Sequence, residues 1–202
     1  MSRKSVFSRI YSRDIWRGIE TRSGAGSTMV ATQTLREALP QLVHGLGITS
    51  LLDAGCGDAH WIPDLEGVEY IGVDLVGAAI RRATAKHPDR TFLLRDIVSD
   101  PLPRVDAILC RDVLQHLERV DVLSALENFT DSGADWLLAT TFSDGDNDSK
   151  GATGGYQEWN LCEEPFGLGA PHMSITYTGW WREDGELVPV AEAVLGAWKM
   201  VG

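Results

Sequence analysis

Long hydrophobic runs, paired cysteines and zinc-ligand spacings are all missing from this sequence. The 202 residues contain no run of about 18 apolar residues, so we expect no transmembrane segment. Residues 1–10 lack the apolar stretch typical of a secretory signal. The three cysteines, Cys56, Cys110 and Cys162, form no CxxC pair. We therefore predict a cytoplasmic protein with reduced thiols and no metal site.

Basic residues are scarce outside the N-terminus. Residues 1–22 contain six of the 18 basic side chains but only two of the 29 acidic ones, so the rest of the chain is strongly acidic. Because an acidic surface binds phosphate backbones poorly, a nucleic-acid partner is disfavoured. The basic arm could contact an anionic partner or substrate, or it could be a solvated, flexible terminus.

The chain length suits one domain, which we place at residues 28–202, preceded by an arm over residues 1–27. Strands that alternate with helices indicate a mostly parallel sheet covered on both faces. Pro40 is expected to kink or split the first helix. Hydrophobic periodicity predicts strands over 49–54, 69–74, 90–94, 105–110 and 135–142, and helices over 28–46, 58–65, 76–86 and 121–129.

The alternation of strands and helices stops after the fifth strand. Residues 143–171 begin as a polar, glycine-rich loop and continue as an irregular stretch. Two final strands, over about 173–180 and 194–200, flank a charged turn that contains Gly185. No helix of useful length fits between these strands, so we expect them to pair antiparallel.

A D-x-G-x-G motif, with Asp53, Gly55 and Gly57, follows the first predicted strand. Glycines at this position allow a tight turn and the close approach of a ligand, and open parallel sheets bind ligands beyond the carboxyl ends of their strands. A helix that begins directly after the turn would add free N–H groups for an anionic group. A G-x-G alone is weak evidence, because many such pairs are ordinary turns.

Two carboxylates after the next strands strengthen this interpretation. Asp74 ends the second strand and is placed to accept hydrogen bonds from two ribose hydroxyls. Asp96 follows the third strand, where its carboxylate can face an adenine amino group. Either residue alone could instead be a helix cap or a turn residue. A nicotinamide dinucleotide is disfavoured because His60 occupies the place of the third glycine of that fingerprint.

The series LLDAGCG, YIGVDL, LLRDI and DAILCRDVLQHL resembles the successive motifs of the class I S-adenosylmethionine-dependent methyltransferases. The resemblance covers about residues 49–142, and the final strand pair extends it to about residue 200. It implies an α/β fold: a Rossmann-like three-layer αβα sandwich with a mostly parallel seven-stranded sheet and a C-terminal antiparallel strand pair. The last strand would be inserted beside the fifth. The helix that the family has after the fifth strand is replaced here by residues 143–171, which leaves acceptor recognition open.

The resemblance also implies S-adenosylmethionine as the cofactor. Its adenine, ribose and methionine parts would lie along the carboxyl ends of the strands. The predicted cofactor-binding residues are Asp53, Gly55 and Gly57 at the methionine, Asp74 at the ribose, Asp96 and Ile97 at the adenine, and Arg111 at the methyl-transfer site, with Ala54, Cys56 and Leu75 completing the set.

Asp112 and His116 are the predicted catalytic residues. If a helical turn runs through them, their spacing places both on one face, where they could orient or deprotonate an acceptor. His116 could instead pack against the cofactor or cap a helix. Trp159 could form a wall for an apolar or cationic acceptor, Tyr177 could contact the acceptor, and residues 16–27 could fold over the bound cofactor as a lid.

These features predict an O- or N-methyltransferase that acts on a small molecule. Nucleic-acid methylation is an alternative, but the sequence contains neither the [DNS]PP[YFW] motif of amino-group DNA methyltransferases nor a Pro-Cys nucleophile. A catalytically silent cofactor-binding module is a second alternative. The sequence leaves the acceptor and the oligomeric state open.

Overall fold

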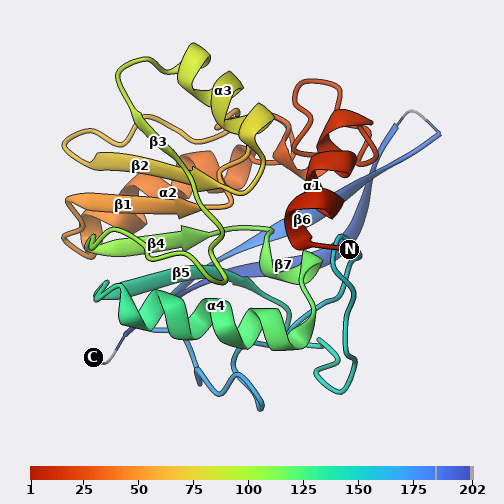
Figure 1. Ribbon diagram of the computed structural model, residues 1–202. Coiled ribbons are helices and arrows are strands. Elements are labelled where there is room, and N and C mark those ends of the chain that lie inside the picture. The colour runs from red at the N-terminus through yellow and green to blue at the C-terminus, as the bar shows by residue number, and fades with distance from the viewer. Residues whose placement is uncertain (185, 201–202) are drawn as a thin grey trace.

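The computed structural model describes residues 1–184 and 186–200, and one sheet organises this part of the chain. Gly185, in the predicted charged turn, and residues 201–202, at the end of the predicted domain, lie outside the described residues. The strands are β1 (Ser50–Ala54), β2 (Glu69–Asp74), β3 (Thr91–Leu94), β4 (Ala107–Cys110), β5 (Trp136–Thr141), β6 (Met173–Glu183) and β7 (Glu186–Lys199). Their order is β3-β2-β1-β4-β5-β7-β6 (Figure 1).

The strand pairing follows the prediction. The first five strands are parallel, whereas β7 is antiparallel to both β5 and β6. β7 is inserted between β5 and β6, as the resemblance implies. The final pair is longer than expected, because β6 extends to Glu183 and β7 begins at Glu186.

Helices cover the sheet on both faces. The helices that cover it are α2 (Gln33–Gly45), α3 (Gly77–Lys86) and α4 (Arg119–Asp131), whereas α1 (Arg3–Ser12) belongs to the arm and packs on α3. Short 3₁₀ turns are η1 (Ala25–Ser27) and η2 (Leu114–His116). α2 continues through Pro40, so the helix is not split there. None of the described helices combines the length and the hydropathy needed to cross a membrane.

Alternate residues of the central strands pack in two separate hydrophobic cores, one on each face of the sheet. Leu51 and Leu109 pack with the apolar side of α2 in one core. Their neighbours Leu52 and Ile108 pack with α4 in the other. All four side chains are fully buried, as expected for strands covered on both faces. The result is the predicted three-layer αβα sandwich.

The predicted helix over residues 58–65 is wrong. These residues form turns and extended backbone between β1 and β2. Ala59 has a φ of 50°, which a right-handed helix does not allow, and Pro63 has no N–H to donate. The apolar residues that suggested a helix, including Trp61 and Leu65, are buried in the core where a helix would otherwise pack.

Residues 143–171 lie between β5 and β6 and contain no helix or strand, as expected. Trp159 is 1% exposed and donates a hydrogen bond from Nε1 to the carbonyl of Leu114 at 3.1 Å. Together with Leu161 and Phe166 it packs in the core beside α4. These side chains fill the space of the missing helix, and Trp159 does not wall an acceptor site.

Candidate functional site

A cavity lies at the carboxyl ends of β1, β2 and β4, and residues of the N-terminal arm also line it. Asp112 and His116, the predicted catalytic residues, both line it. Ala54 does not, because its side chain is fully buried in the core. The other predicted cofactor-binding residues all line the cavity: Asp53, Gly55, Cys56, Gly57, Asp74, Leu75, Asp96, Ile97 and Arg111.

The glycine turn after β1 requires glycine at both positions. Gly55 has a φ of 85° and Gly57 a φ of 58°, in the region that favours residues without a Cβ. A Cβ at Gly55 would lie 2.5 Å from Cγ2 of Val113, and one at Gly57 would overlap Oγ of Ser23. The turn therefore approaches Val113, after β4, and Ser23, in the arm, more closely than a side chain at Gly55 or Gly57 would permit.

Asp74 ends β2 beside this turn. Its Oδ2 accepts the N–H of Gly57 at 2.9 Å, and its Oδ1 accepts the N–H of Val76 at 2.7 Å. Burial raises the pKa of Asp74 to about 6, against the effect of these two N–H groups. A carboxylate has about four acceptor positions, so each oxygen retains one for a further donor in the cavity. This arrangement fits a diol.

Asp53 lines the cavity from its floor. It is 4% exposed, and its Oδ2 accepts a 2.6 Å hydrogen bond from the hydroxyl of Tyr70. Burial raises the pKa of Asp53 to about 6. The side chain therefore supports the floor of the cavity, and its hydrogen bond is made with the protein.

Asp96 is engaged by the N-terminal arm. Its Oδ2 accepts hydrogen bonds from Nε and Nη2 of Arg3 at 3.2 and 3.0 Å, and its Oδ1 accepts the N–H of Val98 at 3.0 Å. Nη1 of Arg3 reaches Oδ1 of Asp121 in α4 at 2.7 Å. An adenine amino group would thus compete with Arg3 for the same carboxylate oxygen.

A polar cluster lies after β4. Arg111 pairs with Asp112 at 2.7 Å, and its guanidinium lies 5.2 Å from the ring of Trp61 and 5.3 Å from that of Tyr177. The Tyr177 hydroxyl donates to Oδ1 of Asp112 at 2.6 Å. Thr140 accepts the N–H of Asp112 at 2.9 Å. β6 thereby holds Tyr177 against a loop 65 residues earlier in the chain.

The expected helical turn through Asp112 and His116 is wrong. Asp112 has a φ of 53°, and η2 begins only at Leu114. The hydrogen bonds from Tyr177 and Thr140 hold Asp112 in this conformation, so it and His116 do not share a helix face. Both nevertheless line the cavity, where the charge of Asp112 acts to raise the pKa of His116.

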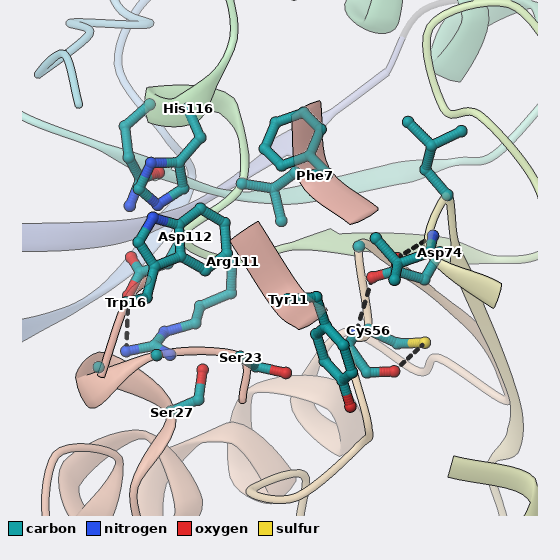
Figure 2. A pocket seen from close by; sticks show the side chains of 18 of the residues that line it. Phe7, Tyr11, Trp16, Ser23, Ser27, Cys56, Asp74, Arg111, Asp112 and His116 are labelled. Carbon is teal, nitrogen blue, oxygen red and sulfur yellow. Dashed lines mark hydrogen bonds and ion pairs between the residues drawn. The ribbon is translucent and has the colours of Figure 1, made fainter. Parts of the chain in front are cut away.

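His116 lies between the arm and the long loop. Its ring centroid is 4.7 Å from that of Trp16, and its Nδ1 is 2.6 Å from the carbonyl oxygen of Gly155. Burial lowers the pKa of His116. Figure 2 shows Trp16 next to His116, and Phe7 and Tyr11 around the space that Asp74 borders.

Asp58 ties the arm to the glycine turn. The hydroxyl of Thr21 donates to Oδ1 of Asp58 at 2.5 Å, and Ser23 contacts the same oxygen at 3.4 Å. Lys86 pairs with Oδ2 at 3.0 Å. Farther along, Glu20 and His60 form a second contact at 3.0 Å. In the structure the arm is therefore folded across the cavity, and its solvated alternative is not observed.

Removal of the Thr21 hydroxyl should loosen the arm. We expect Thr21→Val to speed amide hydrogen exchange across residues 16–27 at least about tenfold, because a hydrogen bond to a charged group contributes about 1.5–3 kcal/mol. The matched control is Thr84→Val, which removes an exposed hydroxyl that bonds to the carbonyl of Ile80 within α3. Equal exchange in both variants would contradict the role given to Asp58.

Sequence reasoning missed three contacts at the cavity, two of which involve the arm. Arg3 was one basic residue among six, and nothing in its neighbourhood pointed to Asp96. Asp58 was placed at the start of a helix that does not form. Tyr177 was a weak candidate, and its partner Asp112 became evident only in the folded chain.

Comparison with known proteins agrees with this geometry. The family model described as "Methyltransferase domain" matches residues 26–186. No curated protein matches the sequence. Two similar solved structures are magnesium protoporphyrin IX methyltransferase (ChlM) from Synechocystis PCC 6803 with bound SAH, and the PH0226 protein from Pyrococcus horikoshii OT3.

Both structural similarities extend over most of the chain. The Synechocystis enzyme is 16% identical with a TM-score of 0.61, over 96% of this chain and 100% of that chain. The Pyrococcus protein is 13% identical with a TM-score of 0.61, over 89% of this chain and 97% of that chain. At such low identity these structures establish the fold alone.

Proposed function

Since the chain belongs to the methyltransferase-domain family, we propose that it transfers a methyl group from S-adenosylmethionine to a small-molecule acceptor. The observation that carries the proposal is the position of Asp74. Its two oxygens each accept one backbone N–H and each keep an acceptor position beside the glycine turn. A vicinal diol, such as that of a ribose, satisfies both positions.

The remaining residues at this edge of the sheet fit the rest of the cofactor. The glycine turn provides a cradle that a Cβ would fill, and Ile97 offers an apolar surface next to Asp96. When bound, S-adenosylmethionine supplies a methyl group on a positively charged sulfur. We assign Gly55 and Gly57 to the methionine part, Asp74 and Leu75 to the ribose, and Asp96 to the adenine.

Asp112 and His116 are assigned to the acceptor side. Methyl transfer to a nucleophile is an in-line displacement, so alignment of the acceptor supplies much of the rate. Asp112 is held rigidly by Arg111 and Tyr177, which suits a group that orients an acceptor. His116 has a lowered pKa and stays neutral near pH 7, which suits a group that accepts a proton.

The arm over residues 1–27 is assigned as a lid. Phe7, Tyr11 and Trp16 line the cavity from the side opposite the strands. Arg3 bridges Asp96 and Asp121. It must release Oδ2 of Asp96 before an adenine amino group can donate a hydrogen bond to that oxygen. The lid would therefore open for cofactor entry and close over the acceptor.

Two measurements, made one after the other, test the proposed methyl transfer. Calorimetry should give binding of S-adenosylhomocysteine and none of NAD; the reverse would overturn the cofactor assignment. Incubation of the protein with methyl-labelled cofactor and fractionated cell extract should then place label in small molecules. Label confined to nucleic acid would overturn the acceptor class, and binding without any label would favour a silent module.

A further inference from the structure

The acceptor side of the cavity is rich in aromatic side chains. Tyr156 is 50% exposed and Trp181 is 44% exposed, although both belong to the lining. Large aromatic side chains left open at a cavity indicate a ligand with apolar surface. The aromatic side chains that line this part of the cavity are Trp16, Phe142, Tyr156, Trp180 and Trp181.

The charges in this part of the cavity are already compensated. The guanidinium of Arg111 pairs with Asp112, and the Arg111 side chain is 2% exposed. Trp61 and Tyr177 lie against its faces. Nη2 is 2.7 Å from the carboxylate of Asp112 but in poor alignment for a hydrogen bond, so we treat the contact as an ion pair. Among the described residues of this part of the cavity, a charged acceptor would find no free opposite charge, and a neutral one is favoured.

The hydrogen bond of His116 fixes the position of its proton. A carbonyl oxygen can only accept, so Nδ1, which lies 2.6 Å from the Gly155 oxygen, carries the hydrogen. In the neutral ring Nε2 then holds the lone pair. Nε2 makes no hydrogen bond within the described part of the chain. It is also not one of the fully buried atoms that lack a partner, so it is accessible. It is therefore an available proton acceptor at the cavity.

We propose that the acceptor is a neutral aromatic hydroxyl compound, a phenol, whose hydroxyl meets Nε2 of His116. The proposal rests on the proposed methyl transfer. The phenol oxygen bonds to the methyl carbon while the sulfur–methyl bond breaks, and that electron pair stays on sulfur. The phenolic proton passes to Nε2. An aliphatic alcohol fits less well because it is far less acidic than a phenol, whose pKa is about 10 in tyrosine.

Two titratable groups act on the ring of His116. Asp112, from the segment before η2, raises its pKa through charge, and Tyr156, from the long loop, lies 6.0 Å away between ring centroids. Trp16, from the arm, and Gly155 add no charge. Because burial outweighs the effect of Asp112 and lowers the pKa, activity should rise with pH and level off below the ordinary histidine value of about 6.5.

The test uses three probes with one ring system, 4-nitrophenol, 4-nitrobenzyl alcohol and 4-nitroaniline. It is run at about pH 6, because the nitro group makes this phenol far more acidic than tyrosine and it is mostly uncharged only below neutral pH. Calorimetry in the presence of S-adenosylhomocysteine should give at least about tenfold tighter binding of the phenol than of the other two. His116→Gln can still donate to Gly155, so we expect it to bind S-adenosylhomocysteine and the phenol within about threefold of the unmodified protein. Its kcat/KM for the phenol should fall at least about 100-fold.

The matched control is His44→Gln. His44 is also a histidine that bonds a backbone carbonyl, that of Glu66, but it is remote from the cavity lining. His44→Gln should keep its turnover. The absorbance of bound 4-nitrophenol should also show a larger phenolate fraction in His44→Gln than in His116→Gln. Equal turnover in both variants, or preference for the alcohol or the amine, would overturn the phenol proposal. Failure to bind S-adenosylhomocysteine at all would instead overturn the proposed function.

Discussion

Asp74→Asn is expected to lower the affinity for S-adenosylhomocysteine at least about 100-fold. Hydrogen bonds to a charged group contribute about 1.5–3 kcal/mol each, and two ribose hydroxyls would lose a charged acceptor. The new amide nitrogen would also bring its N–H donors against the N–H of either Gly57 or Val76, both of which now donate to the carboxylate. Calorimetry with S-adenosylhomocysteine measures the change directly.

The control for this variant is Asp106→Asn. Asp106 lies just before β4, at the opposite end of the sheet, and its Oδ2 also accepts backbone N–H groups, those of Thr49 at 2.8 Å and Ser50 at 2.9 Å. Loss of these bonds should lower stability and leave S-adenosylhomocysteine affinity unchanged. If both variants keep full affinity, Asp74 does not bind the ribose. Urea unfolding of each variant identifies any loss that comes from misfolding.

Asp53→Asn is expected to remove a pH-dependent penalty on stability of about 3 kcal/mol. The pKa of Asp53 rises from 3.8 to about 6 on folding because the side chain is buried. Well below pH 3.8 both states are protonated and no penalty exists. Between pH 4 and 6 the carboxyl ionises in the unfolded state but stays mostly protonated in the folded state. The free energy of unfolding therefore falls by about 1.4 kcal/mol for each pH unit in this range. Above pH 6 the penalty is constant.

The measurement is the difference in unfolding free energy between Asp53→Asn and the unmodified protein, taken in urea at pH 4, 5, 6 and 7. Comparison at each pH cancels the carboxylates that do not interact with Asp53; Asp74, whose charge helps to raise the pKa of Asp53, contributes to the difference. The difference should shift in favour of the variant by about 2 kcal/mol from pH 4 to pH 7, because the unfolded carboxyl is already partly ionised at pH 4. A difference that does not change with pH would contradict the raised pKa. The hydrogen bond from Tyr70 favours the charged carboxylate and so reduces the rise in the pKa of Asp53 that burial causes.

Local patterns were sufficient to predict the sheet and one side of the site. The family resemblance is confirmed, as is the insertion of the last strand beside the fifth. Gly55, Gly57 and Asp74 were identified because each lies within a few residues of a buried strand whose apolar run is visible in the sequence. Parallel strands then bring their carboxyl ends to one edge without further information.

The errors came from contacts between distant residues. Residues 58–65 have apolar side chains at helical spacing, but Ala59 adopts a positive φ and the side chains fill the core from an irregular segment. The backbone at Asp112 depends on Tyr177, 65 residues later. Arg3 and Asp96 are 93 residues apart. No periodicity or short motif encodes such pairs, and only the folded chain brings them together.

A crystal structure with S-adenosylhomocysteine bound tests the central claim most directly. We predict both ribose hydroxyls within hydrogen-bond distance of the Asp74 carboxylate, and the Arg3 side chain displaced from Oδ2 of Asp96 by the adenine amino group. A ligand bound away from β2, or one whose ribose avoids Asp74 while Arg3 keeps its present contacts, would contradict the account.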